Sequence, residues 1–230
     1  MTTVFGLRHD KVDSAVLVAD RQATFMDLRT GVPQSKYLGR KLWKSKDDNY
    51  CFGHTGLMDE QANDFVNELI DGKFDMEKII KEQYFEELRN LNISRMGKEV
   101  PELQNISGFL LATRFDKNPK LYTCFPLGSV QERSWTCAGS GDKKIIEYMN
   151  ALQIMSEAQD YMKEKGEFDI RGVIRVGLEA VRRAQGQDMY SSGLDMMVCT
   201  QKKIIDHYSE LGDDFGKKLR KIQNQYKNSK

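Results

Sequence analysis

The sequence contains few prolines and cysteines, and its net charge is close to zero. Its 230 residues include four prolines and four cysteines, and 35 basic residues stand against 34 acidic ones, which leaves a net charge of +1. A chain this close to neutral has no general electrostatic attraction to nucleic acids or to anionic membranes. We therefore expect neither nucleic acid nor a membrane as a partner.

Long apolar runs are also missing. The longest, such as residues 15–19 and 109–112, are far shorter than the roughly 20 residues of a membrane-spanning helix. The first residues do not show the basic and then apolar pattern of a secretory leader. Together these features predict a cytoplasmic protein.

The cysteines and histidines are too scattered to indicate a metal site. The four cysteines contain no C-x-x-C pair, and the three histidines lie far apart, at positions 9, 54 and 207. Zinc sites and disulfide frameworks are recognised by closer spacings of these residue types. We expect no metal, no cofactor and no disulfide framework.

The apolar pattern predicts strands and helices in separate groups along one large domain. Alternating or continuous short apolar segments predict strands, and apolar residues at helical spacing predict helices. The expected strands cover residues 2–8, 15–19, 40–44, 50–53, 106–113, 121–125, 135–138, 194–200 and 203–205, and the expected helices cover 58–72, 75–91, 143–166 and 169–186. Residues 21–38 and 91–104 are expected as irregular connections.

The order of these groups favours an α+β fold. Along the chain, a first group of strands is followed by two helices, a second group of strands, two more helices and a last group of strands, with one further helix in the tail. Grouping of this kind is typical of stacked sheets covered by helices, and it argues against a fold built from alternating βαβ units. The tail, residues 213–230, carries an excess of basic residues and predicts a helix that is either solvated or used for docking.

The start of the chain offers a nucleophile. It reads Met1-Thr2-Thr3, and removal of the initiator methionine would leave Thr2 with a free α-amine. A terminal threonine combines two catalytic groups, because its hydroxyl can attack a carbonyl while its amine accepts the proton near neutral pH. Such a residue must be held by an ordered strand, and the strand expected at residues 2–8 would hold it.

Two charged residues lie at the ends of predicted strands. Asp20 follows the apolar run at residues 15–19, and Lys41 belongs to a short strand. If they pair beside Thr2, a fixed ammonium group would lower the pKa of the terminal amine and stabilise alkoxide character at the hydroxyl. The alternative is an ordinary surface acid and an ordinary strand lysine.

Five blocks of sequence occur in order along the chain. The first is Thr2-Thr3-Val4 with residues 18–24, the second is Arg40-Lys41-Leu42, and the third is residues 51–56. The fourth joins residues 125–129 with 137–141, and the fifth is an Asp-x-x-Ser pattern within residues 187–193. Together they resemble the proteasome β subunits and the HslV-type bacterial proteases, which are N-terminal nucleophile (Ntn) hydrolases whose nucleophile is a threonine.

This resemblance implies a fold and a domain arrangement. The expected fold is α+β, a four-layer αββα sandwich of two antiparallel sheets flanked by helices. Residues 2–212 would form the Ntn-hydrolase domain, followed by the basic tail at 213–230. Departures from the family, among them a longer connection at residues 21–40, concern loops and so affect substrate specificity more than chemistry.

The resemblance also implies catalytic roles. It assigns Thr2 as nucleophile and base, Asp20 and Lys41 as the charge pair, and the backbone N–H of Gly56 as the oxyanion donor. A glycine after a strand and before a helix can direct its N–H at a developing negative charge. Gly53 competes with Gly56 for this role.

Five more residues receive roles from the resemblance. Ser140, Asp188 and Ser191 are implied as the network that orients the terminal threonine and its amine. Thr24 and His54 are assigned to substrate binding, with Thr24 holding the substrate backbone. Ser140 also lies where a helix N-cap is expected, a role compatible with the first.

The function implied by the resemblance is that of a threonine endopeptidase working through an acyl-enzyme intermediate. It would act on unfolded polypeptides inside a homo-oligomeric ring, hexameric or heptameric and single or doubled, with helices 143–166 and 169–186 as candidate contacts between rings. An ATPase unfoldase or an α-type ring is a candidate partner. The alternatives are an amidohydrolase or transpeptidase with the same Thr2 site, a non-catalytic ring subunit, and a monomer.

Overall fold

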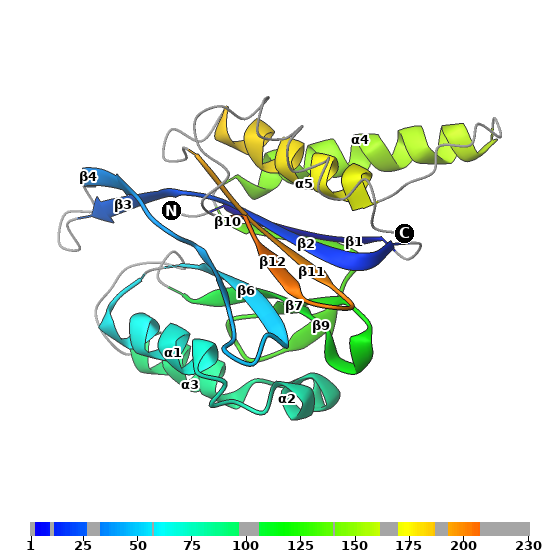
Figure 1. Ribbon diagram of the computed structural model, residues 1–230. Helices are drawn as coiled ribbons and strands as arrows, with labels where there is room; N and C mark the ends of the chain where they lie inside the picture. The colour runs from blue at the N-terminus through cyan, green and yellow to red at the C-terminus, as the bar shows by residue number, and fades with distance from the viewer. Residues whose placement is uncertain are drawn as a thin grey trace.

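A computed structural model describes residues 3–9, 12–26, 33–56, 58–96, 106–139, 141–161, 170–186 and 193–207. Within these residues the chain forms two five-stranded antiparallel sheets, a separate two-stranded sheet and five α-helices (Figure 1). The predicted α+β class with two antiparallel sheets is therefore confirmed. The tail at 213–230 lies outside the described residues, so its helix stays a prediction.

The first sheet joins strands from distant parts of the sequence, in the order β10-β1-β2-β11-β12. β1 and β2, which correspond to the strands predicted at residues 2–8 and 15–19, pair as a hairpin, and β11 pairs with the other edge of β2. The central strand β2 therefore has neighbours on both edges. The bounds are β1 Thr3–His9, β2 Val12–Asp20, β10 Trp135–Gly139, β11 Leu194–Thr200 and β12 Ile204–Asp206.

The second sheet is a meander in which neighbouring strands follow one another along the chain, in the order β5-β6-β7-β8-β9. Its bounds are β5 Leu42–Lys44, β6 Tyr50–Thr55, β7 Gly108–Thr113, β8 Lys120–Cys124 and β9 Val130–Glu132. The sequence pattern predicts four of these strands and misses the short β9. All five pair antiparallel.

Helices lie against the outer faces of both sheets (Figure 1). Two of them, α4 and α5, cover the first sheet, and three, α1 to α3, cover the second. At the N-termini of α1 and α2, the side chains of Asp59 and Asp75 accept hydrogen bonds from the backbone N–H groups of Ala62 and Lys78, respectively. The bounds are α1 Glu60–Ile70, α2 Met76–Glu82, α3 Glu86–Met96, α4 Asp142–Tyr161 and α5 Ile170–Gln185.

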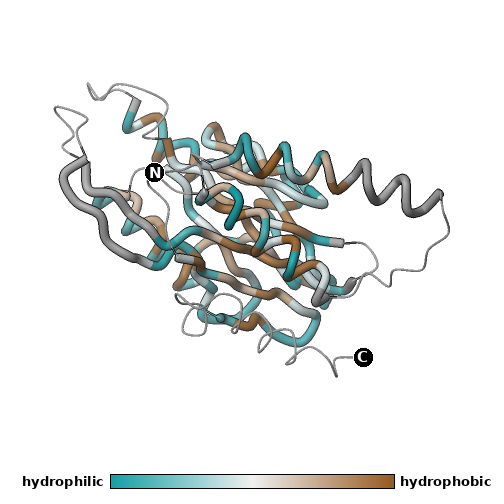
Figure 2. Tube along the Cα trace, turned by 90° about the horizontal axis from the view of Figure 1, so that it is seen from above, coloured by the Kyte–Doolittle hydropathy of each residue, from teal (hydrophilic) through white to brown (hydrophobic). Residues whose placement is uncertain are grey.

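Side-chain alternation along β2 explains why the layers stack. Val16 and Val18 belong to the cluster packed under α4 and α5, whereas Leu17 and Ala19 belong to the cluster between the two sheets. Successive side chains of a strand point to opposite faces, so a continuous apolar strand can serve two cores at once. Seen from above, apolar residues gather on the central strands beneath the helices (Figure 2).

A glycine in β6 lets the two sheets approach closely. A Cβ atom built on Gly53 would lie 2.6 Å from Cγ1 of Val4 and 2.8 Å from Cδ2 of Leu42. Val4 comes from β1 of the first sheet, and both contacting side chains are fully buried. Close packing between the two sheets therefore requires a glycine at this position.

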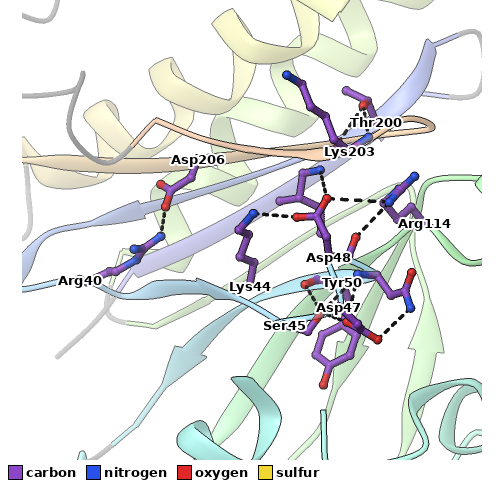
Figure 3. Close-up of polar contacts among 12 residues, drawn as sticks. Arg40, Lys44, Ser45, Asp47, Asp48, Tyr50, Arg114, Thr200, Lys203 and Asp206 are labelled. Carbon is purple, nitrogen blue, oxygen red and sulfur yellow. Dashed lines mark hydrogen bonds and ion pairs between the residues drawn. The ribbon is translucent and has the colours of Figure 1, made fainter. Parts of the chain in front are cut away.

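Polar contacts also connect the sheets, at the turn between β5 and β6. The carboxylate of Asp48 accepts a hydrogen bond from the backbone N–H of Ile204 at 3.1 Å and pairs with Lys44 Nζ at 2.7 Å. Figure 3 shows Asp48 between these groups and Arg114 of the second sheet. Since Ile204 begins β12, this turn attaches the C-terminal hairpin of the first sheet to the second.

The expectation of an irregular loop at residues 21–38 is wrong. β3 (Gln22–Met26) and β4 (Pro33–Leu38) pair as an antiparallel hairpin, with Thr24 opposite Lys36. Pro33 suggests a loop by sequence, but it is the first residue of β4, a position where a strand tolerates proline. In Figure 1 the hairpin projects beyond the two larger sheets.

The single helix expected at residues 75–91 is also wrong, because it is divided into α2 and α3. Gln83 adopts left-handed backbone angles, with φ +56°, and ends α2. The next residues turn toward the second sheet, where the N–H of Phe85 donates to the carbonyl of Gly128 at 2.7 Å. A left-handed position is usually marked by glycine, so the glutamine gives no signal in the sequence.

None of the described helices is long and apolar enough to cross a membrane.

Replacing Gly53 by alanine is expected to lower the free energy of unfolding by about 1–3 kcal/mol, because the added methyl group overlaps Val4 and Leu42 in a filled core. Denaturant unfolding would measure the change. Gly186→Ala is the matched control, since a Cβ there lies in ordinary contact at 3.6 Å from the nearest atom, Arg183 O. Equal stability of both variants would contradict the packing role of Gly53.

Candidate active site

Three chain segments meet at one end of the molecule. β1 begins at Thr3 and β2 ends at Asp20, and the antiparallel register, with Val4 opposite Ala19, brings these two ends together. Lys41 comes directly before β5 of the second sheet. The first residue of β1 is thus close to one charged residue from each sheet.

The Asp20 carboxylate contacts both of the other segments. Oδ2 accepts a hydrogen bond from Lys41 Nζ at 2.8 Å, and Oδ1 accepts one from the backbone N–H of Thr3 at 2.5 Å. The Asp20 side chain is 0% exposed and that of Lys41 is 7% exposed. Removing one partner of such a pair would leave an uncompensated buried charge, so the contact fixes both side chains.

Thr3 is also held on its other side. Its hydroxyl accepts a hydrogen bond from the N–H of Gly141 at 3.2 Å, and its backbone pairs with Gly139 of β10. A Cβ atom on Gly141 would lie 2.8 Å from the Thr3 hydroxyl oxygen and 2.7 Å from Cβ of Ala184 in α5. The residues on both sides of position 140 therefore contact Thr3.

The two glycines that compete for the oxyanion role have different surroundings. Gly53 lies inside β6 and pairs with Leu42 on one side and Leu110 on the other. Gly56 follows the last residue of β6 with φ +108°, and a Cβ there would lie 2.3 Å from the carbonyl oxygen of Ile106. Only glycine fits this position, which lies beyond the sheet ladder and favours Gly56 over Gly53.

The β6 segment that leads to Gly56 is connected to Lys41. The backbone N–H of His54 donates to the carbonyl of Lys41 at 3.4 Å. Gly56 follows His54 by two residues, so the candidate oxyanion donor and the buried lysine lie on paired segments of the second sheet.

The His54 side chain belongs to a buried polar network beside Gly56. Its Nε2 lies 2.9 Å from the hydroxyl of Ser107, and Arg95 NH1 donates to the same hydroxyl at 2.6 Å. Arg95 also forms an ion pair with Asp59, the N-cap residue of α1. Arg95 can only donate, so the Ser107 hydroxyl accepts from it and its proton is available for Nε2 in the tautomer of the neutral ring that carries its proton on Nδ1.

Burial keeps this ring neutral. It lowers the pKa of His54 to about 3, and the nearby positive charge of Arg95 acts in the same direction. The residue is 3% exposed. A ring with so little exposed surface is better suited to holding the segments around Gly56 than to the predicted contact with a substrate.

Asn92 completes the network from α3. Its side-chain amide donates to the carbonyls of Leu88, Ser107 and Pro126, and its Oδ1 accepts from the N–H of Ser107 at 2.8 Å. The sequence patterns do not predict Asn92, Arg95 or Ser107 as site residues. Asn92 lies one helical turn after the buried Leu88, and a polar residue on an apolar helix face is the signal that could have revealed it.

The predicted site residues have different outcomes in the structure. It brings Asp20 and Lys41 together, with Gly56 and His54 on the neighbouring strand. Thr24 lies in β3, where only its backbone is described. The remaining four, Thr2, Ser140, Asp188 and Ser191, lie outside the described residues.

Searches against protein families and against curated proteins found no match to this chain. The candidate site therefore rests on its own geometry.

We expect His54 to make folding stability depend on pH. Its pKa is about 3 when folded and 6.5 ordinarily, so its contribution is present above pH 6.5 and is lost as the pH falls toward 3. Between pH 7 and pH 5 the loss is about 2 kcal/mol. Denaturant unfolding of wild type and His54→Asn at both pH values would measure it.

The stability difference between wild type and His54→Asn should shrink by that amount at pH 5. A difference that does not change with pH would show that His54 titrates normally in the folded protein.

Proposed function

We propose that this chain is an N-terminal threonine endopeptidase of the proteasome β and HslV type. The observation that supports it most directly is the pair of contacts made by Asp20. One carboxylate oxygen accepts from Lys41 Nζ and the other from the backbone N–H of Thr3. Thr2 is the covalent neighbour of Thr3, so these contacts support the role that the proposal gives to the Lys41 ammonium beside the nucleophile.

The proposed reaction begins once the initiator methionine has been removed. The Thr2 hydroxyl attacks the peptide carbonyl while the Thr2 α-amine accepts its proton, and a tetrahedral oxyanion forms. The ammonium of Lys41 lowers the pKa of that amine and so keeps it able to accept a proton near neutral pH.

The oxyanion then collapses into an ester. The carbon–nitrogen bond breaks, the leaving amine takes the proton, and the acyl group stays on the Thr2 oxygen. Water hydrolyses this ester by the reverse proton path and regenerates the hydroxyl. The N–H of Gly56 would stabilise both oxyanions; its place after β6 and its fixed backbone support this role.

The same proposal interprets the fold as the four-layer αββα sandwich of Ntn hydrolases. Its support is the burial of three separate apolar clusters, one between the two sheets and one under each set of helices. In that fold, residues 2–212 are the catalytic domain. Ser140, Asp188 and Ser191 would orient the terminal amine, and Thr24 would hold the substrate backbone.

We further propose that the subunit works in the cytoplasm within a hexameric or heptameric ring of identical copies, single or doubled. An amide hydrolase with an open site would attack any unfolded chain, so enclosure restricts access to polypeptides admitted by an ATPase unfoldase or an α-type ring. The helices α4 and α5 are the candidate contacts between rings, because both adjoin segments that lead to the site.

Thr2→Ala is expected to lower kcat for an internally quenched unfolded peptide by about 1,000-fold or more, because the nucleophile is removed. Thr2→Ser should retain part of the activity, since it preserves a hydroxyl and an amine. Size-exclusion chromatography coupled to light scattering would verify that both variants assemble like wild type. Wild-type turnover by an assembled Thr2→Ala protein would rule out the mechanism.

Lys41→Arg is expected to lower kcat by about 100-fold or more, because a planar guanidinium cannot replace a compact ammonium between Asp20 and the amine. Lys44→Arg is the matched control, since Lys44 lies in the same strand region but pairs with Asp48 at the other end of β5. Steady-state kinetics on both variants would decide. If both retain wild-type kcat, Lys41 has no part in the reaction.

A further inference from the structure

Asp195 is a buried carboxylate that the proposed reaction does not use. It is 0% exposed, and its Oδ2 accepts hydrogen bonds from the backbone N–H groups of Leu42 at 3.2 Å and Lys41 at 3.4 Å. Its Oδ1 is buried and has no hydrogen-bond partner among the described residues. An unsatisfied buried carboxylate oxygen is unfavourable for stability, so this arrangement requires an explanation.

The position of Asp195 in β11 connects it to the candidate site. It pairs with Ala19 of β2, and the preceding residue, Leu194, pairs with Asp20. Met197, two residues further along β11, lies in the cluster between the sheets, so alternation directs the Asp195 side chain toward the second sheet. Asp195 therefore reaches from the first sheet to the start of β5.

Two carboxylates from adjacent strands thus hold Lys41 at different points. Asp20 of β2 binds the ammonium group, and Asp195 of β11 binds the main chain. The side chain of a lysine is long and has many rotamers, so a contact with the ammonium alone does not fix the position of its backbone. The second carboxylate removes that freedom.

Charged groups from several segments lie near Asp195. Arg40, just before Lys41, pairs with Asp206 of β12 (Figure 3), and Arg40 Nε donates to the carbonyl of Leu42 at 2.5 Å. Lys41 donates its backbone N–H to Asp195, and Asp20 lies opposite the preceding residue of β11, Leu194. Burial raises the pKa of Asp195 from 3.8 to about 6; Asp206 also raises it, whereas Arg40 and the two backbone N–H groups lower it.

These observations have a consequence for stability. A carboxylate whose pKa is raised in the folded state makes folding less stable as the pH rises from 3.8 to about 6. Above that range the protein holds an ionised, incompletely satisfied group in its interior. Asp195 thus lowers stability while it binds the backbone of the buried Lys41. This combination is better explained by a role in positioning Lys41 than by a role in packing.

We propose that Asp195 is a positioning residue that holds the main chain of Lys41, so that the lysine ammonium reaches Asp20 and, if the proposed function holds, the terminal amine of Thr2. Ionised Asp195 makes the strongest contact with the two N–H groups. Protonation or removal of the charge loosens residues 41 and 42.

The test compares wild type with Asp195→Asn, which preserves the shape of the side chain without its charge. Asp64→Asn is the matched control, because Asp64 is exposed on α1. Three measurements are made at pH 8: the melting temperature, amide hydrogen exchange by mass spectrometry over residues 39–44, and kcat and KM for peptide hydrolysis. Exchange is also measured in wild type at pH 5, corrected for the intrinsic rate.

We expect Asp195→Asn to melt at the same or a higher temperature than wild type, while the amides of residues 41 and 42 exchange about tenfold faster, equivalent to the loss of one moderate hydrogen bond. kcat should fall about tenfold or more with little change in KM. Wild type at pH 5 should also lose protection at these two amides. Asp64→Asn should change none of these quantities.

Unchanged exchange at residues 41 and 42 would overturn the proposal, and so would a lower melting temperature, which would indicate an ordinary structural role. An unchanged kcat in Asp195→Asn, with wild type active, would also overturn it. If wild type hydrolyses no peptide, the proposed function fails. The exchange measurements then decide separately whether Asp195 holds the Lys41 main chain.

Discussion

The ion pair between Asp20 and Lys41 is the interaction on which the arrangement of the candidate site depends. It joins the two sheets at the end where β1 begins, and it is almost completely buried. Buried charges are unfavourable unless their remaining hydrogen-bonding groups are satisfied. The backbone N–H of Thr3 satisfies the second Asp20 oxygen. Through that contact, the charge pair determines where the first described residue of the chain lies.

The apolar layers provide the rigid frame that such a pair requires. β2 supplies side chains to two cores at once, and Gly53 allows Val4 of the first sheet to pack directly against β6. The second sheet is held differently near Gly56. There the polar network of His54, Ser107 and Arg95 replaces apolar packing, and burial keeps the histidine neutral. Apolar contacts thus fix the distance between the sheets, and polar contacts fix the segment after β6.

The grouping of apolar segments along the sequence predicts the fold class. The contact between Asp20 and Lys41 is implied by the family resemblance, because the residues alone also allow an ordinary surface acid and an ordinary strand lysine. A continuous apolar run followed by an acid defines the end of β2, and a glycine at Gly56 marks a strand end. The catalytic roles of these residues stay predictions. The hairpin β3–β4 is missed because Pro33 indicates a loop, and the division of α2 from α3 is missed because Gln83 adopts a glycine-like conformation. Asp195 and Arg95 could not be found by pattern, since their importance arises from contacts between segments more than ten residues apart.

The packing of Gly141 has a mechanical consequence. A Cβ atom at this glycine would lie within 3 Å of both the Thr3 side chain and Ala184 of α5, so the helix, the glycine and the strand are closely packed at this point. Closely packed interiors are nearly incompressible and transmit strain. Any load that moves α5 toward the sheet, such as pressure from a neighbouring molecule, therefore reaches the start of β1 without being absorbed on the way.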